Sequence, residues 1–130
     1  MELNGKIVAI VQARMGSTRL PNKILKSIQG MPMLWHIVSR LKSVDEIDEV
    51  VIATSDLPSD DQVYEMAKNY GIACFRGSET DVLNRFYSAA KMMDAQYVIR
   101  ITGDCPLVDP LTISKLIQLY FNDQFDFCGV

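Results

Sequence analysis

The chain has 130 residues, a length typical of one domain with a single hydrophobic core. Nearly half of the residues are hydrophobic and no repetitive or proline-rich tract occurs, which excludes a disordered chain. No apolar run approaches the roughly 20 residues of a membrane helix, and the N-terminus lacks the apolar core of a signal peptide. We therefore expect a soluble cytoplasmic protein without a membrane partner, whose cysteines (Cys74, Cys105, Cys128) stay reduced.

The net charge of −3 conceals a strong asymmetry. Residues 1–44 hold seven Lys or Arg against one acid, whereas residues 45–130 hold six against fifteen acids. A local basic patch suits a small polyanion such as a nucleoside triphosphate better than a nucleic acid, because duplex binding needs a wider basic face. Chance clustering on a solvated surface explains the charge alone equally well.

Short strands alternate with helices along the chain. Residues 6–12 (KIVAIVQ) are rich in β-branched residues without polar alternation, which predicts a strand buried on both faces. Further strands are predicted at 49–54, 72–75 and 97–102, and residues 125–130 resemble the start of another.

Four helices are predicted between these strands. The first follows Pro32, and the others follow the capping candidates Ser59 or Asp60, Thr80 or Asp81, and Asp109 with Pro110. Their apolar residues recur at helical spacing, and each set lies on one helix face. These sets are Leu34, Ile37, Val38 and Leu41; Val63, Met66, Ala67 and Tyr70; Val82, Leu83, Phe86, Tyr87, Ala90 and Met93; and Ile113, Leu116, Ile117, Tyr120 and Phe121.

This order predicts an α/β fold, a three-layer sandwich around a mostly parallel sheet. In such sheets ligands bind outside the carboxyl ends of the strands. We therefore expect the functional residues in the loops 13–30, 55–58 and 103–109.

The first of these loops is suited to a triphosphate. It places the cations Arg14, Arg19 and Lys23 around Gly16 and Ser17, where the backbone can approach an anion closely. It contains neither the Walker A pattern nor the dinucleotide fingerprint, which excludes those two classes. An exposed basic connection between a strand and a helix is an equal alternative on these residues alone.

Together these residues match the pattern R-x-x-S-x-R-L-P-x-K, and two further segments follow in order: R-G-S-E-T-D-V-L-N-R at 76–85 and G-D-C-P-L at 103–107. This arrangement resembles the cytidylyltransferase family, which includes acylneuraminate and KDO cytidylyltransferases and, with the nearest pattern, the spore coat polysaccharide biosynthesis proteins. The resemblance implies a fold like that of the nucleotide-diphospho-sugar transferases (GT-A). Family members are much longer, so it also implies that residues 1–130 form the N-terminal, nucleotide-binding part of such a domain. Apolar surface left open would favour self-association, for instance as a homodimer.

The resemblance also assigns site residues. It implies that Arg14 and Lys23 hold the phosphates and act in catalysis, and that Asp104 binds Mg²⁺. The remaining nucleotide-binding residues that it implies are Ala13, Gly16, Ser17, Arg19, Ser55, Asp56 and Arg76. Plain alternatives stay open: Asp104 as a turn residue before Pro106, Ser55 and Asp56 as an ordinary turn, and Arg76 as a surface partner of Glu79.

The implied reaction transfers CMP from CTP to the hydroxyl of a sugar or sugar acid and releases pyrophosphate, in cell-surface or spore-coat polysaccharide biosynthesis. Thr102 stands where the KDO enzymes have Gln, so another base remains an alternative. A non-catalytic nucleotide-binding module is a second alternative. His36, the only histidine, has no partner in these motifs, and we expect a structural role for it.

Overall fold

The computed structural model describes residues 5–15, 23–102 and 109–123. The predictions that concern Gly16, Ser17, Arg19, Asp104 and the strand at 125–130 lie outside these ranges. Within them, no helix combines the length and the apolar character that crossing a membrane requires.

The central sheet consists of four parallel strands in the order β5-β4-β1-β6. Their bounds are Ile7–Gln12 (β1), Glu49–Ser55 (β4), Ala73–Gly77 (β5) and Tyr97–Thr102 (β6). β1 is central, and its residues 7–11 are almost completely buried. The continuous apolar run in the sequence therefore correctly predicted a strand that is covered on both faces, as strands of parallel sheets are.

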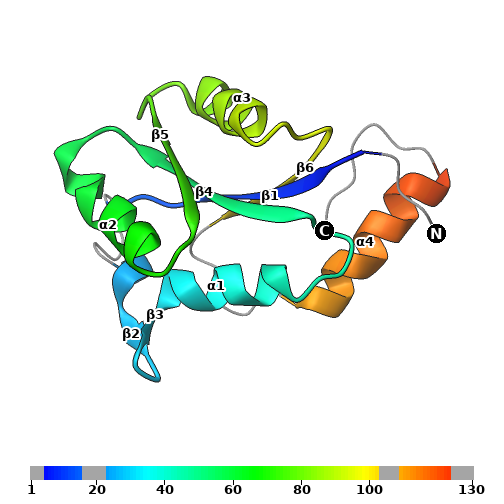
Figure 1. The fold of residues 1–130 in the computed structure, drawn as a ribbon, viewed down its shortest axis with the longest axis horizontal. Coiled ribbons are helices and arrows are strands. Elements are labelled where there is room, and N and C mark those ends of the chain that lie inside the picture. Colours follow the sequence, from blue (N-terminus) through cyan, green and yellow to red (C-terminus); the bar gives the residue numbers. More distant parts are fainter. Residues whose placement is uncertain (1–4, 16–22, 103–108, 124–130) are drawn as a thin grey trace.

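Helices cover both faces of this sheet, as predicted (Figure 1). On one face, α1 (Met33–Lys42), α2 (Asp61–Asn69) and α4 (Pro110–Asp123) contribute to one apolar core with alternate residues of β1 and β4. On the other face, α3 (Val82–Met92) packs on Val8, Ile10, Val51 and Ala53. The three-layer arrangement is thus confirmed for the described residues.

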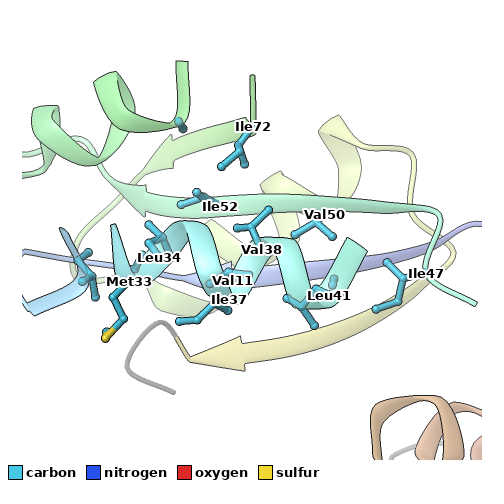
Figure 2. Packing of buried hydrophobic residues seen from close by; sticks show 14 of the residues in the cluster. Val11, Met33, Leu34, Ile37, Val38, Leu41, Ile47, Val50, Ile52 and Ile72 are labelled. Carbon is cyan, nitrogen blue, oxygen red and sulfur yellow. The ribbon is translucent and has the colours of Figure 1, made fainter. Parts of the chain in front are cut away.

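The larger core forms around α1. Leu34, Ile37, Val38 and Leu41 are buried on the inner face of this helix, where they lie against Val11, Val50 and Ile52 of the sheet (Figure 2). Each such side chain contributes about 1.5–3 kcal/mol by leaving water. This packing fixes β1 and β4, and with them the start of the loops that follow both strands.

Two features of the chain between β1 and α1, a short turn and a hairpin, were not predicted. A 3₁₀ turn at Lys23–Leu25 precedes a small antiparallel hairpin of β2 (Ser27–Ile28) and β3 (Met31–Pro32). Its turn residues Gln29 and Gly30 have φ of 53° and 84°, the left-handed conformation that such tight turns demand. The side chain of His36 lies against it, with Nε2 2.7 Å from the carbonyl oxygen of Ile28.

The predicted apolar face of α3 is correct only in part, because Phe86, Ala90 and Met93 pack against the core residues beneath the helix whereas Leu83 and Tyr87 do not. Leu83 and Tyr87 are 81% and 65% exposed, whereas Arg85 and Ala89 are fully buried. The small Ala89 lets the helix approach β1 and β4, and Arg85 finds a hydrogen-bond acceptor at the end of β5. Tyr70, predicted in the stripe of α2, is likewise exposed because it lies at the helix end.

The half-buried Cys74 is a free thiol on β5. Burial raises the pKa of this thiol to about 11, although the nearby Arg76 opposes the shift. The thiolate is therefore scarce at neutral pH, as expected of an unreactive structural cysteine.

Candidate functional site

The strand order marks one place in the sheet for a ligand. From β1 the chain adds β4 and β5 on one side and then returns to add β6 on the other. At this switch point the connections diverge above and below the sheet and leave a crevice outside the carboxyl ends of the strands. Gln12 and Thr102 pair at the ends of β1 and β6, so the loops beginning at residues 13 and 103 start on either side of this point.

The chain after β1 is held by the neighbouring strand and its loop. Ala13, which is buried, donates its backbone N–H to the carbonyl oxygen of Ala53 at 3.1 Å. The N–H of Met15 donates to Oδ1 of Asp60 at 2.7 Å. Arg14 lies between these two anchors, so its backbone is fixed at the mouth of β1.

Asp60 connects two of the predicted loops and was missed as a site residue. It is 1% exposed, and its carboxylate accepts both the Met15 N–H and the hydroxyl of Ser55. Sequence reasoning proposed Asp60 as a cap of α2, and it does occupy the N-cap position, but its side chain makes no capping hydrogen bond. The local sequence does not distinguish an aspartate that caps a helix from one that accepts a distant N–H, since the Met15 N–H comes from 45 residues away.

Arg14 faces Glu79 across the site. Its Nη2 lies 3.3 Å from Oε1 of Glu79, and both side chains are about one-third exposed. Ion pairs of this exposure contribute about 0–1 kcal/mol. Arg14 can therefore exchange this carboxylate for another anion at little cost.

Arg76 is engaged with the loop after β4. Its Nε donates to the carbonyl oxygen of Ser55 at 2.9 Å and its Nη2 to that of Leu57 at 2.8 Å. Its Nη1 pairs with Asp61 at 2.8 Å, and the guanidinium lies over the ring of Tyr64. Through these contacts Arg76 fixes the backbone of the segment that carries Ser55 and the exposed Asp56.

Of the ten predicted site residues, six lie in the described ranges, and five of these six come to one end of the sheet. Ala13 and Arg14 lie at β1, Ser55 and Asp56 at β4, and Arg76 at β5. Lys23 begins the 3₁₀ turn that leads away from the loop. Within residues 5–15, 23–102 and 109–123, no group of three or more His, Cys, Asp or Glu residues is arranged for a metal ion, and the predicted ligand Asp104 lies outside them.

A second residue that sequence reasoning missed is Arg85 of α3. Its Nη1 donates to the carbonyl oxygen of Ser78 at 2.9 Å, while its side chain is fully buried. Burial lowers the pKa of this guanidinium, and the positive charge of Arg14 lowers it further, although Asp60 and Glu79 oppose the shift. Two sequence signals could have drawn attention to it: its position in an otherwise apolar helix face, and its place at the end of the family segment 76–85.

The fold is an α/β fold with a parallel sheet, and Arg14 places a cation at its switch point, where proteins of this kind bind ligands. The cytidylyltransferase family model matches residues 8–129, and the chain belongs to this family. It is 39% identical over 125 residues to the spore coat polysaccharide biosynthesis protein SpsF of Bacillus subtilis, covering 93% of this chain and 52% of that protein. It is 31% identical over 127 residues to the 8-amino-3,8-dideoxy-manno-octulosonate cytidylyltransferase of Shewanella frigidimarina, covering 94% and 50%.

Solved structures agree with this assignment. A cytidylyltransferase from Leptospira borgpetersenii superposes with a TM-score of 0.86 at 37% identity, covering 93% of this chain and 51% of that one. A CMP:2-keto-3-deoxy-manno-octonic acid synthetase, solved in complex with CTP, gives a TM-score of 0.80 at 30% identity, covering 92% and 48%. The chain thus spans about half the length of the relatives that it matches.

Proposed function

We propose that the protein is a sugar nucleotidyltransferase that transfers CMP from CTP to the hydroxyl of a sugar or sugar acid and releases pyrophosphate. The observation that carries this proposal is the family match over residues 8–129 together with Arg14 held at the switch point of the sheet. The spore coat polysaccharide biosynthesis protein among the relatives supports a role in cell-surface or spore-coat polysaccharide biosynthesis, for which we propose a cytoplasmic location.

In the proposed reaction, the acceptor oxygen attacks the α-phosphorus of CTP. The new phosphorus–oxygen bond forms as the bond to the β-phosphate oxygen breaks, and the acceptor hydroxyl loses its proton. The chain's contribution is positioning and charge neutralisation, as is usual in phosphoryl-group chemistry. No covalent intermediate with the protein is required.

Each residue of the site has a proposed part in this reaction. Arg14 leaves Glu79 and, with Lys23, neutralises the phosphates and the departing pyrophosphate. Ser55, Asp56 and Arg76 form the wall of the base pocket, with Arg76 acting through the backbone that it holds. The residues proposed to approach the phosphates through the loop after β1 are Ala13, Gly16, Ser17 and Arg19.

Asp104 is the proposed ligand of a Mg²⁺ ion. Such an ion typically takes one or two carboxylates plus substrate phosphates, and it would supply further charge neutralisation at the phosphates. The support is the resemblance of residues 103–106 to the family's G-D-x-P turn, together with the position of the preceding residue, Thr102, which pairs with Gln12 beside the switch point.

Calorimetric titration with CTP, UTP, ATP and GTP, with and without Mg²⁺, tests the proposal. We expect CTP to bind most tightly and Mg²⁺ to strengthen its binding. If another triphosphate binds most tightly, that triphosphate replaces CTP in the proposal. Pyrophosphate release with CTP and sugar acids, assayed on the longest available form of the protein, separates an enzyme from a non-catalytic module.

The variant Asp104→Asn isolates the role of the metal. Because the change is nearly isosteric, we expect an unchanged melting temperature and loss of the Mg²⁺-dependent part of CTP affinity. An equal response to Mg²⁺ in the variant and the parent would show that Asp104 is a turn residue.

A further inference from the structure

The guanidinium of Arg85 is a buried cation with unused hydrogen-bonding capacity. Arg85 is the largest of the fully buried side chains in the described part of the chain, with 0% of its surface exposed. Only Nη1 is engaged, at 2.9 Å from the Ser78 carbonyl oxygen and 3.5 Å from that of Glu79. Nε and Nη2 have no hydrogen-bond partner among the described residues. Such a charge is costly to bury unless an anion pairs with it.

The two unused nitrogens form one edge of the guanidinium. The N–H groups of Nε and Nη2 point the same way in the planar group, and this fork matches two oxygens of a phosphate or carboxylate. The engaged nitrogen, Nη1, belongs to the opposite edge. The free donors are therefore arranged for bidentate contact with an anion.

The carboxylates nearby are already occupied. Asp60 accepts the Met15 N–H and the Ser55 hydroxyl, and Glu79 is paired with Arg14. Within residues 5–15, 23–102 and 109–123, no carboxylate oxygen forms an ion pair with Arg85. Both carboxylates nonetheless oppose the lowering of the pKa of Arg85, whereas Arg14 adds to it.

A purely structural role does not account for this arrangement. Arg85 does fill space beside β5, since a Cβ on Gly77 would lie 3.3 Å from Cγ of Arg85. Its contact with Ser78 braces the turn that carries Glu79. Filling the space beside β5 and bracing the turn at Ser78, however, require only a long side chain with one hydrogen-bond donor. They leave the cost of a charged fork without hydrogen bonds unexplained.

We propose that Arg85 is a further phosphate-binding residue, which holds two oxygens of the nucleoside triphosphate through Nε and Nη2 once Arg14 has left Glu79. The inference rests on the proposed function for the identity of the ligand. Arg14 provides the exposed charge that an arriving polyphosphate meets first. Arg85 provides a second, desolvated charge behind it, where charge-assisted hydrogen bonds are strongest.

The direct test follows the side-chain Nε–H resonance of Arg85 by NMR in the unmodified protein. Inorganic tripolyphosphate and CTP serve as probes, and we expect both to shift this resonance strongly. Cytidine, which carries no phosphate, should leave it nearly unchanged. A resonance that stays in place at saturating CTP overturns the proposal, and so does failure of both polyphosphates to bind.

Three variants add an affinity measurement. We expect Arg85→Met to weaken tripolyphosphate and CTP binding roughly ten- to a hundredfold, because charge and fork are both lost. Arg85→Lys, which keeps the charge without the fork, should fall between Arg85→Met and the parent. The matched control is Arg40→Met on the exposed part of α1. Equal affinities in folded Arg85→Met and the parent contradict the proposal, and if Arg85→Met does not fold, the NMR titration decides.

These measurements keep the two hypotheses apart. Preference for CTP over the other triphosphates reports on the proposed function alone, because Arg85 is not proposed to contact the base. Tripolyphosphate binding that depends on Arg85 would support this inference even if the preferred base were not cytosine.

Discussion

Arg14 is the residue at which sequence pattern and structure agree most directly. The pattern placed a cation just after a buried strand, and the structure holds its backbone between the anchors at Ala13 and Met15. Its side chain is partly exposed and paired with Glu79. A partly exposed cation in a weak ion pair is available to a phosphate. Mutation of Arg14 or of Glu79 changes the strength of this pair.

Removing the charge of Arg14 should weaken triphosphate binding. We expect Arg14→Ala and Lys23→Ala each to lose roughly ten- to a hundredfold in CTP affinity, since each removes a charge-assisted contact. Calorimetry measures the effect, and Arg40→Ala at the far end of α1 is the control. Unchanged affinity in both variants would contradict the assignment of this loop to phosphates.

The opposite change at Glu79 should have the opposite sign. Glu79→Gln removes the competitor for Arg14, so we expect CTP affinity to rise by a few-fold, in line with an exposed ion pair of about 0–1 kcal/mol. The same titration checks it. A fall in affinity would mean that Glu79 supports the ligand and does not compete with it.

Residues whose partners are distant in sequence could not be predicted. The basic loop after β1 was recognised because its residues are adjacent in the chain. Asp60 accepts the N–H of Met15, which is 45 positions away, and Arg85 is fully buried in a helix whose Leu83 and Tyr87 are exposed. Asp60 was taken for a helix cap and Arg85 was given no role, since local spacing carries no information about such contacts.

At the scale of elements, Asp60 joins the start of α2 to the chain after β1. We expect Asp60→Ala to reduce the free energy of unfolding by about 2–4 kcal/mol, because the Met15 N–H and the Ser55 hydroxyl would lose a buried charged acceptor. Urea denaturation measures this loss. The exposed neighbour provides the control: Asp61→Ala, which breaks only a surface pair with Arg76, should cost less than about 1 kcal/mol.

The N-terminus of α4 should show a local pH dependence. The hydroxyl of Thr112 at 2.8 Å and the N–H of Leu111 at 3.1 Å lower the pKa of the Asp109 carboxyl. A lowered pKa in the folded state means that the cap stabilises the helix above about pH 3.9, and that this contribution disappears as the pH falls through the folded value. A carboxyl ¹³C titration should therefore give a midpoint below about 3.9. In Thr112→Val, which removes the largest cause, the midpoint should move upward.

For the molecule as a whole, the alternation of strands and helices was sufficient to predict the layers. Strand β1 and the stripes of α1 and α4 were found because burial on one side leaves a regular period in the sequence. The orientation of α3 was found only in part, because its apolar residues occupy a wide arc and several rotations would bury part of it. Which part of α3 is buried depends on its tertiary contacts with the sheet beneath it and on the burial of Arg85. The local sequence gives no information about either.

The exposed side of α3 and β6 should make the protein self-associate. β6 is an edge of the described sheet, and its residues alternate, with Tyr97, Ile99 and Ile101 packed against the larger core and Val98 48% exposed on the opposite face. Leu83, Tyr87 and Met92 of α3 add further exposed apolar side chains. Exposed apolar groups and an open strand edge favour association with a second copy.

We expect sedimentation to show concentration-dependent dimers or larger species of the 130-residue chain. Leu83→Glu combined with Val98→Glu should shift it toward monomer, because each change puts a charge on the apolar surface. The control is Leu111→Glu, which alters a similarly exposed leucine on α4, across the sheet from α3. A monomer at all concentrations would contradict the prediction. Equal association in the double variant and the parent would mean that another surface is responsible.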